Sequence, residues 1–229
     1  MKINNTSLLF LLCAAGAASV ALTGCKVCTA HSIQKVEAAT DSGAVNIHQM
    51  GGDINVADAP NGASLHTMGG NIRVGSVASF AKLHTMGGNI TVERAQGSVD
   101  ASTMGGVIRI DDTNGPVKAS TMGGDITVRE IGSSTDRRDI ELDSKGGTIQ
   151  LVVPNNFPME VHIQLATTRN ATREFHIIDK LGLKQQESQG WDSSFGTPRR
   201  YIREEGVVGS GLNHITIKTI NGDVILKQE

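Results

Sequence analysis

A unit of 18 residues that recurs along the chain is the feature that most limits how the chain can fold. Aligned on a pair of glycines, five copies follow one another at this constant step: QMGGDINV, TMGGNIRV, TMGGNITV, TMGGVIRI and TMGGDITV, which begin at Gln49, Thr67, Thr85, Thr103 and Thr121. Two less regular copies, SKGGTIQL and TINGDVIL, begin at Ser144 and Thr219. A unit this short cannot bury a core alone, so about seven of them are expected to stack into one solenoid.

Alternation within each unit predicts two strands in every turn of the solenoid. Apolar residues alternate with polar ones before the glycines, as at Val45 and Ile47, and again after them, as at Ile54 and Val56. A period of two places the apolar side chains on one face. The predicted fold class is therefore all-β, a single-stranded β-solenoid (β-helix) with 18-residue turns.

The threonine and the glycines of each unit are predicted to serve the fold. The threonine falls on the inward face, where a β-branched side chain packs well and its hydroxyl can bond to backbone. The glycines are predicted to turn the chain with a φ that larger residues resist. The next position, as in Asp53 and Asn71, is expected to cap the turn with local hydrogen bonds rather than bind calcium, because Val107 interrupts the column.

The first residues have the features of an export signal. An apolar run too short to span a bilayer follows Lys2 and ends in Leu22-Thr23-Gly24-Cys25. This ending resembles the lipobox of bacterial lipoproteins, which implies cleavage before Cys25 and attachment of lipid to its sulfur. We therefore expect a signal peptide over 1–24, a lipidated N-terminus and linker over 25–41, and a solenoid domain over 42–229.

The same resemblance suggests where the protein resides. Lys26 follows the cysteine, in place of the aspartate that retains many lipoproteins in the inner membrane. The expected location is the cell envelope, at the outer membrane facing the periplasm or at the cell surface. The Cys25-x-x-Cys28 spacing is not expected to form a redox or zinc site, because lipidation would leave Cys28 as the only thiol of the mature chain.

Composition argues against nucleic acid as a partner. The full chain has 21 basic and 23 acidic residues, and removal of Lys2 with the signal leaves 20 against 23, a net charge of −3. Aromatic residues make up only 3% of the chain, with a single Trp, so few side chains are available to stack on bases or sugars.

Several motifs together resemble a known family. The recurring T-x-G-G-D/N-I-x-V units, the segment TIQLVVP from Thr148 and the segment GSGLNHITIKTINGDVIL from Gly209 are similar to bacterial adhesin-like domains of unknown function, also called toastrack domains. The similarity extends from about Ser42 to Leu226. It implies an extracytoplasmic β-solenoid, with no catalytic residues to transfer.

The segment 166–211 departs from this pattern. It contains Trp191 and no 18-residue unit, and an irregular insertion before the last turn is expected there. An ordinary loop is favoured over a lateral flap that holds a partner, although loops of this length are often functional.

Solenoids also include enzymes that cleave polysaccharides, and such enzymes need carboxylates clustered on one face. Asp111 and Asp112 are adjacent in one strand, which would direct them to opposite faces. The protein is therefore expected not to be an enzyme, and a polysaccharide-active enzyme is an unfavoured alternative.

Two residue types remain that the fold does not explain. The inward threonine should leave both of its neighbours pointing outward, and these are His48 and Met50, His66 and Met68, and His84 and Met86 in the first three units. The next two units keep only the methionines, Met104 and Met122. Thioether and imidazole are ligands that suit Cu(I) and, by analogy, Ag(I), so the paired residues are a candidate soft-metal site.

Three alternatives to a metal site stay open for these residues. The methionines could close the edge of the core, since Met fills irregular gaps. They could form a contact strip for an envelope protein, for which Met104, Met122 and Trp191 are candidates. Duplication of the repeat unit could also have copied these residues although they have no function. The function expected overall is that of a non-enzymatic protein anchored to the membrane through Cys25, with a structural or protein-interaction, adhesin-like role and with soft-metal binding as the alternative.

Overall fold

The computed structural model describes residues 28–30, 36–38, 43–132, 137–194 and 196–229. The predicted signal peptide and the lipidation site Cys25 lie outside these residues. All regular structure in the described part is β-strand, arranged in two long sheets. This confirms the predicted all-β class.

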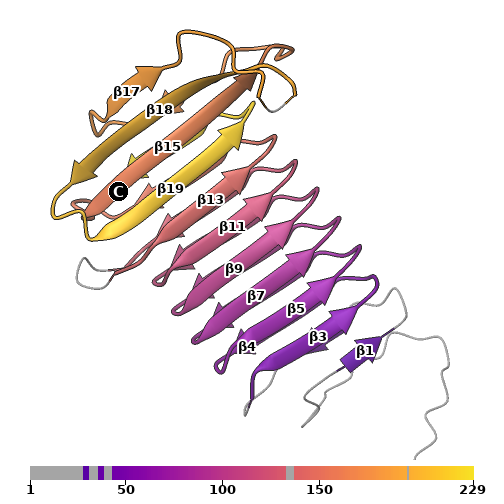
Figure 1. The fold of residues 1–229 in the computed structure, drawn as a ribbon. Coiled ribbons are helices and arrows are strands. Elements are labelled where there is room, and N and C mark those ends of the chain that lie inside the picture. The colour runs from indigo at the N-terminus through magenta and orange to yellow at the C-terminus, as the bar shows by residue number, and fades with distance from the viewer. Residues whose placement is uncertain (1–27, 31–35, 39–42, 133–136, 195) are drawn as a thin grey trace, which may run out of the picture.

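The chain crosses from one sheet to the other as it winds, and one full turn is called a coil. The larger sheet has 11 strands, in the order β1 (Cys28–Ala30), β3 (Val45–Gln49), β5 (Ala63–Thr67), β7 (Phe80–Thr85), β9 (Ser98–Thr103), β11 (Val117–Thr121), β13 (Ile140–Ser144), β19 (Asn213–Ile220), β15 (Met159–Thr168), β18 (Arg199–Val208) and β17 (Lys184–Glu187). The smaller sheet has nine, in the order β16 (Ile177–Ile178), β20 (Val224–Gln228), β14 (Ile149–Val153), β12 (Ile126–Glu130), β10 (Ile108–Thr113), β8 (Ile90–Ala95), β6 (Ile72–Val77), β4 (Ile54–Ala59) and β2 (Val36–Ala38). Figure 1 shows these strands stacked side by side along one axis.

Parallel pairing in constant register explains the sequence repeat. Ile54 is paired with Ile72, and Ile72 with Ile90, each partner standing 18 positions further along the chain. The step lengthens to 23 positions where Val117 is paired with Ile140, and to 75 positions where Ile140 is paired with Ile215. Equivalent residues of successive units therefore lie directly over one another, and any property of one unit position becomes a row along the stack.

The core lies between the two sheets and consists of such rows. Strand β3 alternates buried and exposed residues along its whole length, as the sequence pattern predicts. The isoleucine after each glycine pair is almost fully buried, at most 1% exposed, in Ile54, Ile72, Ile90, Ile108, Ile126 and Ile149. Burial of a branched aliphatic side chain contributes roughly 1.5–3 kcal/mol, so these rows are a main source of stability.

The buried threonines join each coil to the one before it, as predicted for their hydroxyls. Thr85 Oγ1 donates a hydrogen bond to the carbonyl of Gly70 (2.8 Å) and accepts one from the amide of its own Gly88 (3.3 Å). Thr103 repeats the arrangement, bonding to the carbonyl of Gly88 at 2.9 Å. The threonine row is thus a buried ladder of hydroxyl-to-backbone bonds.

The glycine pairs serve a different purpose from the one predicted. A positive φ occurs at Gly52 (92°), but the following second glycines Gly70, Gly88, Gly106, Gly124 and Gly147 lie outside the left-handed region. A Cβ on Gly88 would come closer than 3.0 Å to the carbonyl oxygen of Gly70. Close contact between stacked coils therefore excludes a side chain there, and the explanation from φ is wrong for these positions.

The polar residue after each glycine pair also bonds between coils rather than locally. Asp53 Oδ1 accepts the amide N–H of Asn71 (2.8 Å), and Asn71 Oδ1 accepts that of Asn89 (2.9 Å). The amide N–H of Thr148 donates the same kind of bond to Asp125 Oδ1, across a step of 23 residues. The predicted local cap is thus replaced by a second ladder along the turn.

The segment 166–211, predicted as an irregular insertion, contains irregular stretches and also strands: the end of β15, and β16, β17 and β18. β15 and β18 pair antiparallel over ten residues each, β17 adds to β18, and β16 pairs with β20. β19 lies between β13 and β15, so the last repeat is covered by the segment that precedes it in sequence. Strands β15, β18 and β17 end the larger sheet beyond β19 (Figure 1), β16 ends the smaller sheet beyond β20, and together these four strands form a cap on the stack.

The other end of the stack begins earlier than the predicted domain boundary at 42. The described residues 28–30 and 36–38 form β1 and β2, which pair with β3 and β4. Part of the predicted linker therefore continues the solenoid. Sequence patterns did not indicate this because these strands are short and lack the glycine pair.

Candidate functional site

The three histidines form a row on the outer face of the larger sheet. His48 is in register with His66 and His66 with His84, on β3, β5 and β7. Their rings are stacked, with centroids 4.1 Å apart for the first pair and 4.8 Å for the second, and interplanar angles of 8° and 7°. We call this row the histidine stack.

The environment of the histidine stack favours neutral imidazole at its centre. Partial burial lowers the pKa of His66, and the neighbouring His48 and His84 lower it further because two positive charges at stacking distance repel. His84 Nδ1 lies 2.6 Å from the hydroxyl of Ser102, which occupies the same position in the next coil. The stack therefore ends in a serine.

The five methionines lie along the turn that follows the odd-numbered strands. Met50, Met68, Met86, Met104 and Met122 are 58%, 39%, 39%, 46% and 52% exposed, and we call this row the methionine edge. This exposure argues against the idea that the methionines close the edge of the core. Lys145 and Ile220 occupy the corresponding places of the next two coils, because Thr121 is in register with Ser144 and Ser144 with Thr219.

The histidine stack does not have the geometry of a preformed metal site. An imidazole nitrogen donates its lone pair to a metal in the plane of the ring, and rings that lie parallel at 4.1–4.8 Å hold these lone pairs in separate parallel planes, so that they do not converge on one ion between the rings. Among the residues that the structure describes, no group of three or more His, Cys, Asp or Glu side chains is placed to hold a metal ion. Coordination by His48, His66 or His84 would need rotation of the rings.

Trp191 does not belong to the methionine edge. It lies between β17 and β18 in the cap, beyond the positions of Lys145 and Ile220, so the structure separates it from Met104 and Met122. There it lines a pocket of about 510 Å³, whose walls are residues 167–169, 171–176, 187, 191 and 200–202. We call it the cap pocket.

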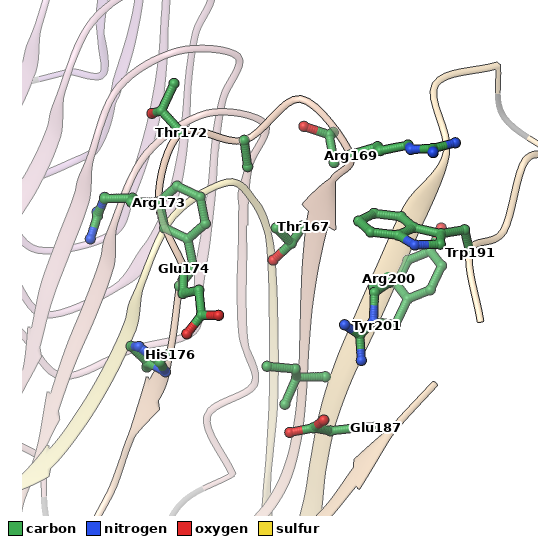
Figure 2. Close-up of a pocket in the computed structure, with 14 residues that line it drawn as sticks. Thr167, Arg169, Thr172, Arg173, Glu174, His176, Glu187, Trp191, Arg200 and Tyr201 are labelled. Atoms are coloured by element: carbon green, nitrogen blue, oxygen red, sulfur yellow. The ribbon is translucent and has the colours of Figure 1, made fainter. Parts of the chain in front are cut away.

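The cap pocket has two chemically different sides. Figure 2 shows Arg169, Trp191, Arg200 and Tyr201 on one side and Arg173, Glu174 and His176 on the other. The Arg200 guanidinium lies 5.8 Å from the centroid of the Trp191 ring, within reach of a cation–π interaction. Across the pocket, Arg173 is paired with Asp223 at 2.9 Å and lies over the Phe175 ring at 4.4 Å.

The adjacent aspartates considered for catalysis have separate structural partners. Arg109 Nε lies 2.6 Å from Asp111, whereas Asp112 is paired with Arg129. Each carboxylate is thus neutralised by a different arginine on the protein surface.

Sequence reasoning did not find two buried carboxyl groups. Glu130, at the end of β12, has its pKa raised to about 7, mainly because burial disfavours its charge, although it accepts the amide of Gly132 and faces Arg138 at 3.9 Å. Burial also raises the pKa of Glu204 in β18 to about 7, with a further contribution from Asp179. The only feature of the sequence that could have indicated these two residues is a charged side chain at an inward position of the alternating pattern.

The fold and these rows define a class: a parallel β-solenoid with a strand-built cap and regular outer rows. The family model described as Toastrack DUF4097 matches residues 29–169. The chain therefore belongs to the toastrack domain family, whose function is unknown, and the predicted family resemblance is confirmed.

No curated protein and no solved structure matches the chain. Within the described ranges, the structure contains no helix whose length and apolar character would let it cross a bilayer.

Proposed function

We propose that this protein is a non-enzymatic cell-envelope scaffold that binds another protein along the methionine edge. The observation that supports this proposal is the exposure of five methionines, each 39–58% accessible, in one row of the solenoid. Scattered exposed apolar residues are ordinary, but a contiguous apolar row is typical of contact surfaces.

The row has dimensions suited to an extended partner. At roughly 4.8 Å between neighbouring strands, five positions span about 19 Å. Methionine is enriched in protein interfaces and adapts its flexible side chain to the opposing surface. Most turn residues beside the row are polar, as at Asn71 and Asn89, whose side chains are engaged with backbone, whereas Val107 is apolar and 40% exposed. An apolar strip with a largely polar border is therefore presented to the partner.

The proposal includes anchoring to the outer membrane through lipid on Cys25. Cys25 stands three residues before β1, which is at most about 10 Å of extended chain. The first coil would then lie next to the membrane, and the cap would lie at the far end of the 11-stranded sheet, roughly 48 Å away. The methionine edge would run outward from the membrane between these ends.

Site-specific photo-crosslinking in cells tests the interaction. A diazirine amino acid placed at Met68 or Met104 should capture the same envelope protein, whereas one placed at Thr91, on the outer face of the smaller sheet, should not. Replacing the other four methionines with Ser should reduce the crosslink at least fivefold. Equal capture from Thr91, or no capture from either methionine, would contradict the proposal.

Soft-metal binding is the second candidate, favoured by the exposed thioethers that flank a neutral histidine. Cu(I) would be held by sulfur from Met50, Met68 or Met86 together with a rotated imidazole of the histidine stack. A competition titration with a Cu(I) chelator, using the full chain and its Met50, Met68 and Met86 to Ser variant, separates the two functions. Equally weak Cu(I) binding by both chains would exclude the metal function and leave the crosslinking result unaffected.

A further inference from the structure

We propose that the cap pocket is a binding site for a sugar that carries an anionic group, a carboxylate or a phosphate. The inference is independent of the methionine edge, because the pocket lies in the cap and shares no residue with that row. It rests on the size of the pocket and on the chemistry of its two sides.

The size fits one or two sugar rings. A volume of about 510 Å³ lies within the range of small-molecule pockets, roughly 300–1,000 Å³. The walls come from the end of β15, the segment that follows it, and the start of β18, which is held to β15 by ten residue pairs. The Asn221 side chain braces the end of β15, since its Oδ1 accepts the amide N–H of Thr168 at 2.9 Å. The basic side is therefore built on a paired strand.

Trp191 provides a flat apolar surface inside this pocket. It is the only tryptophan of the chain and is 45% exposed, although a side chain of this size is usually largely buried. Its ring extends toward Thr167 in Figure 2. An exposed aromatic face can pack against the C–H face of a sugar ring and still leave the hydroxyls of the sugar free for hydrogen bonds.

Arg169 and Arg200 supply the charge for an anion beside that surface. Within the described part of the chain, neither guanidinium forms an ion pair, whereas Arg173 on the opposite side is paired with Asp223. A guanidinium presents a planar fork of donors that matches a carboxylate or phosphate. The two arginines flank Trp191, so an anionic substituent and a ring could be bound together.

The remaining charged groups of the pocket suit hydroxyls rather than a second anion. Glu174 and Glu187 are exposed carboxylates that accept hydrogen bonds and repel anions. Thr167 and Thr172 add hydroxyls that can donate or accept. A ligand with one anionic end and several hydroxyl donors satisfies both sides, which favours an acidic sugar over a simple anion.

The intrinsic fluorescence of the full chain in detergent provides the test, because Trp191 is the only source of tryptophan emission. Glucuronate and glucose 6-phosphate should each change this emission saturably, whereas glucose and inorganic phosphate should bind at least tenfold more weakly. Whichever acidic sugar binds tighter identifies the anion as carboxylate or phosphate.

Variants provide the second part of the test, followed by calorimetry. Arg169→Gln and Arg200→Gln should each weaken the tighter sugar at least tenfold, whereas Arg73→Gln on the smaller sheet should leave its affinity unchanged. Trp191→Phe keeps an aromatic face and should lose affinity less than Trp191→Leu does. No saturable binding of either acidic sugar, equally tight inorganic phosphate, or unchanged affinity in both arginine variants would overturn the proposal.

Discussion

At the scale of single residues, the two glycines of each unit have unequal roles. The Cα of Gly88 lies against the carbonyl of Gly70 in the preceding coil, whereas a Cβ on Gly87 would have only the carbonyl oxygen of Met68 near it, at 3.8 Å. The sequence shows the two as an identical pair. Only the stacking of coils distinguishes a position that must be glycine from one that merely is.

Alanine substitution should reveal this difference. Gly88→Ala is expected to lower the free energy of unfolding by roughly 2–4 kcal/mol, because a methyl group must displace the neighbouring backbone. Gly87→Ala is the matched control and should change it by less than about 1 kcal/mol. Denaturant unfolding followed by circular dichroism measures both, and equal losses would contradict the close-contact explanation.

Glu130 gives the second prediction at this scale. Its pKa is raised to about 7 in the folded chain, above the ordinary value of 4.5. The unfolded chain therefore binds fewer protons between these values, so the contribution of Glu130 to stability falls as the pH rises from 4.5 to 7. The melting temperature of the parent minus that of Glu130→Gln should therefore decrease as the pH rises from 5 to 7.5. An identical pH profile would show that Glu130 does not titrate in this range.

At the scale of strands, register converts sequence repetition into rows of like residues. Because β3, β5 and β7 pair without offset, three histidines that are far apart in sequence stack ring on ring. In the same register, Ser102 takes the place of histidine in the next coil and contacts His84. The residue at this outward position can therefore differ between coils while the backbone stays the same.

The histidine stack should make this end of the solenoid sensitive to acid. The pKa of His66 is lowered below 6.5, so its contribution to stability is complete above pH 6.5 and is lost as the pH falls below that value. Lys82 and Asp100 are the charged residues on the same outer face of the neighbouring strands β7 and β9. The raised pKa values of Glu130 and Glu204 act against this effect, because their contribution to stability increases as the pH falls.

Comparison with a serine variant isolates the contribution of His66. His66→Ser copies the residue that later coils carry at this position, at Ser102 and Ser120. The melting temperature of the parent minus that of His66→Ser should decrease as the pH is lowered from 7.5 to 5.5, because both chains share the effects of the buried glutamates. A difference that increases on acidification would contradict the expected direction.

At the scale of the whole molecule, the stack is modular in its middle and closed at its ends. β9 contacts only its neighbours β7 and β11 in the larger sheet, while the cap covers β19 and β1 and β2 are only three residues long. Short strands and a covering segment limit the pairing of exposed edges with other chains.

Deletion of one unit tests this modularity. Removal of residues 85–102, one complete 18-residue step, should leave a cooperatively folding chain with native-like β circular dichroism and a lower melting temperature, because nearest-neighbour contacts are restored across the junction. Removal of 86–102, which is one residue shorter, shifts the alternation and turns apolar side chains to solvent. That variant should aggregate, and comparable folding of the two would contradict the register argument.

The part of the structure that could be predicted from the sequence is the regular part, the rows of equivalent residues in the repeat units. The rows that begin at Val45, Ile54 and Thr67 follow from alternation alone, because period-two burial is a local property that stacking multiplies. The cap was not predictable. Strand β15 pairs with β19 and β18, and both of these strands lie far from β15 in the sequence, at separations other than the 18-residue step of the repeat. Sequence reasoning singled out Trp191 but not the pocket that surrounds it.

The sequence by itself determined the class of fold, the inward rows and the outward placement of histidine and methionine, because each depends on neighbours within one unit. The tertiary structure alone decided which glycine must lack a side chain, how the histidine rings stack, and that Arg169, Trp191 and Arg200 share one pocket. These features arise between coils or between strands of the cap. Contacts between residues this far apart in sequence depend on the order in which the strands pair in each sheet, and no local sequence pattern determines that order.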